Sequence, residues 1–156
     1  MAKVTVYTDG GASGNPGPGG YGAVMLSGKH YKELSGAFRL TTNNRMELLA
    51  VIKSLEALKT PGTEVTVYSD SKYVVDSVKK KWVFGWVKKN FKGKKNTDLW
   101  KRFLKIYEMH KVEFVWVKGH AGNEFNEVAD KLAVSAYADG ILPLEVDVAY
   151  EASEKD

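Results

Sequence analysis

The chain has 156 residues, 44% of them hydrophobic and 12% aromatic, a composition typical of one globular domain with its own core. It contains no cysteine, which excludes disulfide bonds and thiolate metal sites. No apolar run approaches the roughly 20 residues that a membrane-spanning helix needs. Because the first residues pass directly into a predicted strand, we expect no signal peptide and a cytoplasmic location.

The formal net charge of +4 hides an uneven distribution. Residues 1–138 hold 22 Lys and Arg against 13 Asp and Glu, a net charge of +9, whereas residues 139–156 hold one Lys against six acids, a net charge of −5. A body with this charge predicts a polyanionic partner. We therefore expect one domain over 1–138 and a flexible acidic tail over 139–156. The alternative is a tail that folds back on the basic surface.

The first half of the chain predicts three strands, a helix and a fourth strand. The helix carries Leu48, Val51, Ile52 and Leu55 on one apolar stripe. The glycine-rich stretch 10–20 predicts a turn segment that holds neither helix nor strand. The five elements are expected at residues 3–9, 21–27, 30–39, 43–59 and 64–69.

The second half predicts two short helices, a longer helix, a fifth strand and a last helix. The fifth strand is apolar enough to be central in a sheet. The first three strands have the spacing of an antiparallel meander, and strands joined through helices are parallel by right-handed crossovers. The order predicts an α/β fold with a five-stranded mixed sheet flanked by helices. The elements of this half are expected at residues 71–80, 82–89, 97–110, 112–117 and 124–138.

Four carboxylates lie at positions that such a fold would bring together. Asp9 and Asp70 follow the first and fourth predicted strands. Glu47 lies in the first turn of the first long helix, and Asp130 lies in the last helix. Sites form outside the carboxyl ends of parallel strands, and clustered carboxylates repel one another unless a cation lies between them. Since oxygen ligands suit Mg²⁺ or Mn²⁺, the pattern predicts a metal-dependent site for cutting phosphodiesters.

Each of these acids also has a purely structural explanation. Asp70 could cap the helix that follows it, and Asp9 could begin a turn. Glu47 stands three residues after Asn44 and could complete a capping box. Asp130 could be a solvated helix residue. We favour the functional interpretation because two strand-end acids and an early helix acid converge on one edge of the predicted sheet.

Two loops beside these acids also indicate chemistry. His120 lies in a glycine-flanked loop that leads into the helix carrying Asp130, where a histidine could shuttle protons; otherwise it is only solvated. The stretch 10–20 lacks the Gly-Lys-Ser/Thr ending of a P-loop. Its glycines would let the backbone approach a nucleic-acid strand, where Asn15 could donate to a sugar or phosphate.

Residues 79–95 form a strongly basic segment with eight lysines, four aromatic residues and no acid. This mixture predicts a protrusion that grips a phosphate backbone, with Trp82, Trp86, Lys88 and Lys89 as substrate-binding candidates. The alternative is a solvated lysine face whose aromatic residues pack a small local core.

Five motifs carry a resemblance to a known family. They are YTDGG at 7–11, GNPGPGGYG at 14–22, TTNNRME at 41–47, SDS at 69–71 and WVKGHAG at 116–122. In this order they are similar to type I ribonuclease H of the bacterial kind, over about residues 3–138, and the basic segment resembles that family's basic protrusion. The tail carries no part of the resemblance.

The resemblance implies a ribonuclease H-like fold and an endonuclease that hydrolyses the RNA strand of RNA–DNA hybrids. It implies 3′-hydroxyl and 5′-phosphate ends and catalysis with two Mg²⁺ ions, or with Mn²⁺. By the same resemblance, Asp9, Glu47, Asp70 and Asp130 match the metal-binding acids, and His120 matches a loop histidine that assists turnover. We expect a monomer that needs no protein partner and no membrane.

The resemblance also implies a set of contacts to the hybrid. It places three asparagines, Asn15, Asn43 and Asn44, in the minor groove. Thr42 and Asn96 match contacts to a phosphate of the DNA strand, and Trp100 matches an aromatic residue near the DNA sugars. Lys72 stands where the bacterial pattern often has Gln, so its groove contact would become a phosphate contact.

Two other functions remain open from the residues alone. Transposases, integrases and junction resolvases share this acid cluster and act on DNA, although the glycine-rich loop and the Asn43–Asn44 pair suit the reading of 2′-hydroxyls. A nucleic-acid-binding module without enzymatic activity would use the basic protrusion alone. Four uncompensated carboxylates argue against such a module because they weaken binding of a polyanion.

Overall fold

The computed structural model describes residues 3–118, 123–140 and 142–154 of the chain. Its five strands form one sheet in the order β3-β2-β1-β4-β5. β1, β2 and β3 pair as an antiparallel meander, and β4 pairs in parallel with both β1 and β5, so the predicted fold class is confirmed. The strands are β1 (Lys3–Ala12), β2 (Gly17–Ser27), β3 (His30–Thr41), β4 (Glu64–Ser69) and β5 (Lys111–Trp116).

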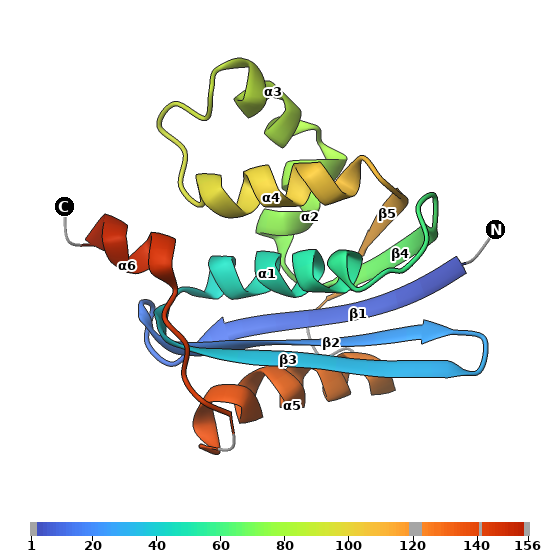
Figure 1. Cartoon of the computed structure of the whole chain (residues 1–156), viewed down its shortest axis with the longest axis horizontal. Coiled ribbons are helices and arrows are strands. Elements are labelled where there is room, and N and C mark those ends of the chain that lie inside the picture. Colours follow the sequence, from blue (N-terminus) through green and yellow to red (C-terminus); the bar gives the residue numbers. More distant parts are fainter. Residues whose placement is uncertain (1–2, 119–122, 141, 155–156) are drawn as a thin grey trace.

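Helices cover both faces of this sheet (Figure 1). One face carries α5, and the other carries α1, with α2 and α4 beyond it and α3 at the outer end of the molecule (Figure 1). Among the described residues, no helix is both long and apolar enough to cross a membrane. The helices are α1 (Asn43–Glu56), α2 (Lys72–Lys79), α3 (Trp82–Lys88), α4 (Thr97–Tyr107), α5 (Glu124–Ala138) and α6 (Val148–Glu154).

Helix α1 is the centre of the core. Its predicted apolar stripe is confirmed, because Leu48, Val51, Ile52 and Leu55 are all 0% exposed. The helix begins after Thr42, whose hydroxyl accepts a hydrogen bond from the backbone N–H of the third helical residue. This cap and the buried stripe together fix the rotation of α1 against the sheet.

The glycine-rich stretch 10–20 is not the turn segment that its composition predicts. β1 continues to Ala12 and β2 begins at Gly17, so only a short connection lies between them. Glycines of this stretch, and Gly22 just after it, allow close packing on both sides of the sheet. A Cβ on Gly10 would lie 2.4 Å from the carbonyl carbon of Met46 in α1, and one on Gly22 would lie 2.4 Å from the carbonyl oxygen of Ala129 in α5. Glycine therefore lets two helix backbones touch the sheet.

The predicted central position of the fifth strand is also wrong. β5 is an edge strand that pairs only with β4. Phe114 is buried, whereas Trp116 is 41% exposed at the end of the strand. Val112 and Phe114 pack into the core on one face of this strand, and a short apolar run does not distinguish this from burial on both faces.

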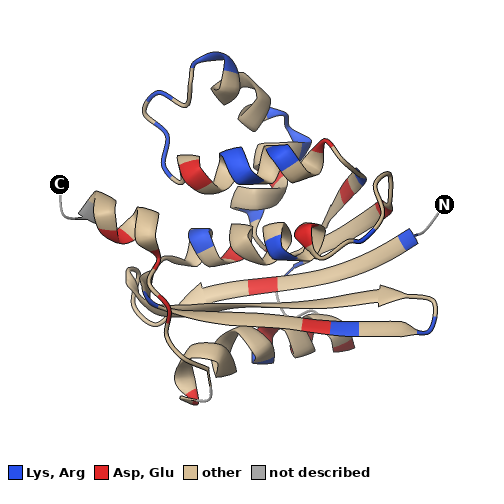
Figure 2. Cartoon of the chain, in the orientation of Figure 1, with Lys and Arg blue, Asp and Glu red and all other residues tan. Residues whose placement is uncertain are grey.

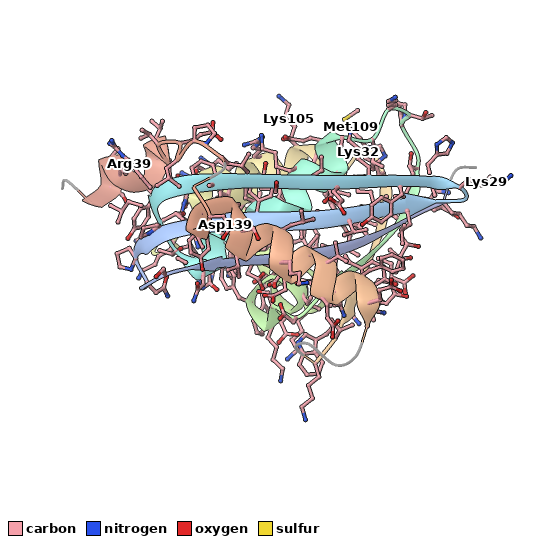
Figure 3. The ribbon with its side chains drawn as sticks, turned by 90° about the horizontal axis from the view of Figure 1, so that it is seen from below. Lys29, Lys32, Arg39, Lys105, Met109 and Asp139 are labelled. Atoms are coloured by element: carbon pink, nitrogen blue, oxygen red, sulfur yellow. The ribbon has the colours of Figure 1, made fainter. Side chains whose placement is uncertain are left out.

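The acidic tail differs from the loose segment that its composition predicts. Within residues 142–154, Glu145 forms a parallel bridge with Phe38 of β3, and the chain continues into α6. Arg39 donates to Glu151 at 2.7 Å, and Figure 3 shows it beside this helix. The tail carries acids that two arginines of the body can pair with, and β3 offers it an unpaired strand edge. Residues 142–154 therefore match the alternative prediction, a tail that folds back on the body of the protein.

The glycine packing gives a stability prediction. We expect Gly22→Ala to lower the free energy of unfolding by about 2 kcal/mol or more, because the added methyl group meets helix backbone that cannot move alone. Gly85→Ala in α3 is the matched control, since a Cβ there meets nothing within 4 Å. That change should be neutral or stabilising by up to about 1 kcal/mol. Urea unfolding of both variants checks this, and equal effects would contradict it.

Candidate active site

The parallel pairing of β1 and β4 ends just before two of the predicted acids. Tyr7 and Tyr68 form the last pair, and their rings stack with centroids 4.8 Å apart. Asp9 and Asp70 each lie two residues beyond that pair. Asp9 is inside β1 rather than at its end, since β1 continues against β2, but it does lie where β1 leaves β4. The predicted convergence at one sheet edge is therefore correct, at a place where neighbouring strands diverge.

Helix α1 brings a third carboxylate to this point. The missing side chain of Gly10 lets the backbone of Met46 and Glu47 lie against β1. Carboxylate oxygens of Asp9, Glu47 and Asp70 all lie within 4.8 Å of one another, a spacing at which they could share a metal ion. Three elements far apart in the sequence thus supply one cluster.

The capping roles that could explain these acids are filled by other residues. Ser71, not Asp70, caps α2, and its hydroxyl accepts from the backbone N–H of Val74 at 3.2 Å. Thr42 caps α1, so Glu47 lies in the second turn and closes no capping box. These two carboxylates are therefore not needed to start a helix.

Burial and mutual repulsion perturb the cluster. Burial, then contact with Asp130, then the charge of Asp70 raise the pKa of Asp9 from 3.8 to about 7. Burial, followed by the charges of Asp9 and Asp70, raises the pKa of Glu47 well above its usual value. A site that penalises carboxylate charge in this way favours a bound cation.

The fourth predicted acid joins the same cleft. Asp130 of α5 lines a cleft of about 450 Å³ with the other three acids. Asn43, Asn44, Lys72 and Tyr73 lie along its walls. The structure thus brings all four predicted carboxylates together.

Two of the predicted groove asparagines, Asn43 and Asn44, line this cleft, and Asn15 is bonded to the backbone of Asn43. Asn15 accepts through Oδ1 from the backbone N–H of Asn43 at 3.0 Å, and Asn43 accepts through Oδ1 from that of Ala12 at 2.6 Å. Both amide oxygens are thereby occupied, which leaves the NH₂ groups as donors. Lys72 lies over the Trp116 ring, with Nζ 4.8 Å from its centroid.

A second cleft of about 780 Å³ lies on the other side of the start of α1. Thr42 and Asn96, the predicted phosphate contacts, both line it, as do Lys94 and Lys95. Asn44 borders both clefts, so the acids and the predicted phosphate site are neighbours.

The basic segment forms the protrusion that its composition predicts. Figure 2 shows basic residues around α3 and along the loop after it, and Lys88 and Lys89 are exposed. Trp82 is 47% exposed, with Lys80 Nζ 5.3 Å from its ring centroid. Trp86 is half-buried, so one tryptophan is free to meet a ligand and the other mainly supports the protrusion.

The predicted substrate contact of Trp100 is wrong. Its side chain is 0% exposed, and the Trp86 ring packs edge-on against it at a centroid distance of 5.8 Å. The indole N–H donates to the hydroxyl of Tyr73 at 2.8 Å. Trp100 stands beside Leu99 and one turn before Phe103, on the apolar stripe of α4, and this spacing could have indicated a core position.

His120 lies outside the described residues, so its predicted role stays a prediction. Sequence reasoning also missed three residues that hold the clefts together: Arg45, Tyr73 and Asp147. Arg45 stood inside the TTNNRME motif and could have been singled out. Asp147 had no local signal in the tail.

Comparisons with known proteins agree with this geometry. The RNase H family model matches residues 1–138. A ribonuclease H of Desulforamulus reducens is 53% identical over 151 residues, covering 94% of each chain, and one of Trichodesmium erythraeum is 51% identical, covering 96% of each. The chain therefore belongs to the RNase H family, and its class of enzyme is a ribonuclease.

Two solved structures support the same assignment. LC9-RNase H1, a type 1 RNase H, superposes with a TM-score of 0.82 at 32% identity, covering 100% of this chain and 82% of that one. LC11-RNase H1, solved in complex with an RNA/DNA hybrid, has a TM-score of 0.65 at 28% identity, covering 88% of this chain and 99% of that one.

The raised pKa of Asp9 gives a stability prediction. The folded protein keeps a proton that the unfolded chain loses above about pH 4, so the stability from this carboxyl is full below that pH and is lost as the pH rises to about 7. In EDTA at pH 8 we expect Asp9→Asn to unfold at a higher temperature than the wild type, with the difference shrinking toward pH 4. Thermal unfolding across this range measures it.

The control for that experiment is Asp76→Asn, which removes the same charge from a surface pair with Lys80. It should show no gain at pH 8. A wild type as stable as Asp9→Asn at pH 8 would mean that burial of this carboxylate has no cost.

Proposed function

We propose that this protein hydrolyses the RNA strand of RNA–DNA hybrids. The observation that carries the proposal is the cluster of Asp9, Glu47 and Asp70 oxygens, all within 4.8 Å, in a cleft edged by asparagines. The family assignment supports it, as does the relative LC11-RNase H1, whose structure is a complex with an RNA/DNA hybrid.

The cofactor proposed for this site is Mg²⁺, two ions with substrate bound, with Mn²⁺ as a substitute. The residues fit such a cation because they offer only carboxylate oxygens, and because burial penalises their charge when no cation is present. Asp9, Glu47, Asp70 and Asp130 would hold it. Bound there, the ions would acidify the attacking water and stabilise the departing 3′-oxygen.

The protein's own side chains would orient the hybrid. Among the described residues the amide oxygens of Asn15 and Asn43 accept hydrogen bonds and their NH₂ groups make none, so the NH₂ groups would donate to 2′-hydroxyls. Thr42 and Asn96 would take a phosphate of the DNA strand in the second cleft, and the protrusion would follow the backbone. Cleavage would leave 3′-hydroxyl and 5′-phosphate ends. The monomeric state and the cytoplasmic location stay predictions from the sequence.

The direct test is cleavage of an end-labelled RNA strand paired with DNA, first with Mg²⁺ and then with EDTA. DNA duplex, RNA duplex and single-stranded RNA run alongside. Cutting confined to the RNA strand of the hybrid, and abolished by EDTA, is the expected result. Cutting of the DNA duplex would favour the transposase and resolvase class, and binding without cutting would favour a binding module.

The carboxylate cluster gives a second prediction. We expect Asp70→Asn to lower the cleavage rate by about a thousandfold or more while hybrid binding survives, because the change removes a metal ligand and leaves the clefts intact. Asp76→Asn, a surface acid, should cleave at nearly the wild-type rate. Steady-state cleavage and a binding titration measure both properties, and near-normal turnover by the first variant would overturn the site assignment.

The protrusion gives a third prediction, on salt dependence. We expect the simultaneous replacement of four protrusion lysines by Gln to weaken hybrid binding and to flatten its dependence on salt, because fewer counterions are released. A control protein loses four exposed lysines away from both clefts, and its salt slope should stay closer to that of the wild type. Figure 3 shows Lys29 at the hairpin tip among them. The replaced lysines are Lys88, Lys89, Lys94 and Lys95, and the control lysines are Lys29, Lys32, Lys59 and Lys105.

Equal slopes for the two proteins would show that the protrusion has no special part in binding. Fluorescence anisotropy of a labelled hybrid over a range of KCl concentrations gives both slopes.

A further inference from the structure

The C-terminal tail forms part of the second cleft. Tyr150 and Ser153 of α6 line it together with Thr42 and Asn96. The tail lies beyond residues 1–138, which the RNase H family model matches. A wall of the predicted phosphate site therefore comes from outside that matched region.

Arg45 is hydrogen-bonded to both residues that are predicted to contact a phosphate. The backbone N–H of Arg45 donates to the hydroxyl oxygen of Thr42 at 3.3 Å. Its Nη1 donates to Oδ1 of Asn96 at 3.3 Å. Thr42 is thus fixed to the start of α1, and a displacement of the Arg45 side chain would move Asn96 relative to it.

Carboxylates and an amide saturate the guanidinium of Arg45, which is 3% exposed. Asp147 accepts from Nε at 2.7 Å and from Nη2 at 2.9 Å. Asp98 accepts from Nη1 at 2.9 Å and from Nη2 at 2.7 Å. With the bond to Asn96, all five N–H donors are used. Arg45 thus has no donor left for a phosphate. We call the ion-pair cluster of Arg45, Asp98 and Asp147 the bracket.

Asp147 is the part of this bracket that the tail supplies. It is 7% exposed and also accepts from the hydroxyl of Thr41 at 2.7 Å. The orientation of the Asn96 amide follows from the bracket, because Oδ1 accepts from Arg45 while Nδ2 donates to the hydroxyl of Tyr73 at 3.1 Å. Within the described part of the chain Nδ2 donates to Tyr73 alone, which leaves its second N–H for a ligand.

We propose that Asp147 is a positioning residue for nucleic-acid binding, which through Arg45 holds Thr42 and Asn96 in the arrangement that takes a backbone phosphate. This inference rests on the proposed function. Without the Asp147 carboxylate, two guanidinium donors lose their partner, and a buried arginine then shifts toward other acceptors. Thr42 and Asn96 would then no longer keep a fixed position relative to each other.

The test compares two tail variants that each remove one negative charge. Asp147→Asn breaks the bracket, whereas Glu151→Gln, on the tail helix, leaves the bracket intact and weakens the pairing with Arg39 of β3. We expect Asp147→Asn to raise the KM for a hybrid, and its Kd in EDTA, by about tenfold with kcat within about twofold. Glu151→Gln should leave all three within about twofold. Equal effects of the two variants would mean that the tail acts through charge alone, and would overturn the proposal.

A double-mutant cycle separates positioning from loss of folding. If Asp147 acts through Asn96, Asp147→Asn should add little to the KM of an Asn96→Ala protein, whereas a general loss of structure would add its full effect. An unchanged KM in Asn96→Ala alone would also overturn the proposal. All assays run well below the unfolding temperature of each variant.

Asp98→Asn is the second variant, to be used if Asp147→Asn does not fold. Its side chain is 40% exposed, so the change removes the other half of the bracket at lower risk, and KM should rise in the same way. A normal KM for a folded Asp98→Asn protein would count against the bracket. Failure of the proposed function would look different, since the wild type itself would not cleave hybrids.

Discussion

Two helix backbones reach the sheet at one place, and the site depends on that close approach. Asp9 pairs across the sheet with Gly22, and its chain neighbour is Gly10. Because Gly22 has no side chain, α5 can pack closely on one face of the sheet, and the same is true of Gly10 and α1 on the other face. Each helix carries one of the candidate acids, Asp130 on α5 and Glu47 on α1. A side chain at either glycine would push an acid away from Asp9, so the chemistry depends on packing as much as on charge.

The chain treats its buried carboxylates in two opposite ways. Around Asp9 the acids face one another, and burial makes their negative charge energetically costly. Around Arg45 two carboxylates share one guanidinium, and no donor is left over. In the first arrangement the carboxylates repel one another, whereas in the second every guanidinium donor has a carboxylate or amide partner. Both arrangements lie at the start of α1, which carries Arg45 and Glu47.

Patterns of polarity in the sequence predicted most of this fold, because most elements bury one face. The stripe on α1 is a clear case, with Leu48 and Ile52 wholly buried. The same reasoning failed where glycine allows helices to pack closely on the sheet. A run of glycines predicts a turn unless the helices that contact it are known, so the sequence predicts that the first strand ends at Asp9, whereas β1 continues to Ala12. The position of β5 at the sheet edge likewise depends on the order of strands.

The candidate acids were predictable because each is fixed by an element that the sequence shows. The family resemblance implies that Trp100 contacts the DNA strand, but the apolar spacing of α4 indicates a core position, and the side chain is buried. The tail was misjudged for a different reason. Its acids resemble a solvated charge run, and only the folded body shows that Asp147 meets Arg45 across about a hundred residues of chain.

The seating of the tail also changes the outer edge of the sheet. An edge strand presents unpaired backbone groups that can recruit a second chain, and β3 is such a strand. The tail occupies part of that edge through two backbone hydrogen bonds. The N–H of Arg39 donates to the carbonyl of Glu145, and the N–H of Glu145 donates to the carbonyl of Ala37, each at 2.9 Å. Farther along, the strand carries Lys32 and Glu33, charges that discourage edge-to-edge association. The segment that lines the second cleft thus also covers part of a strand edge at which a second chain could otherwise pair.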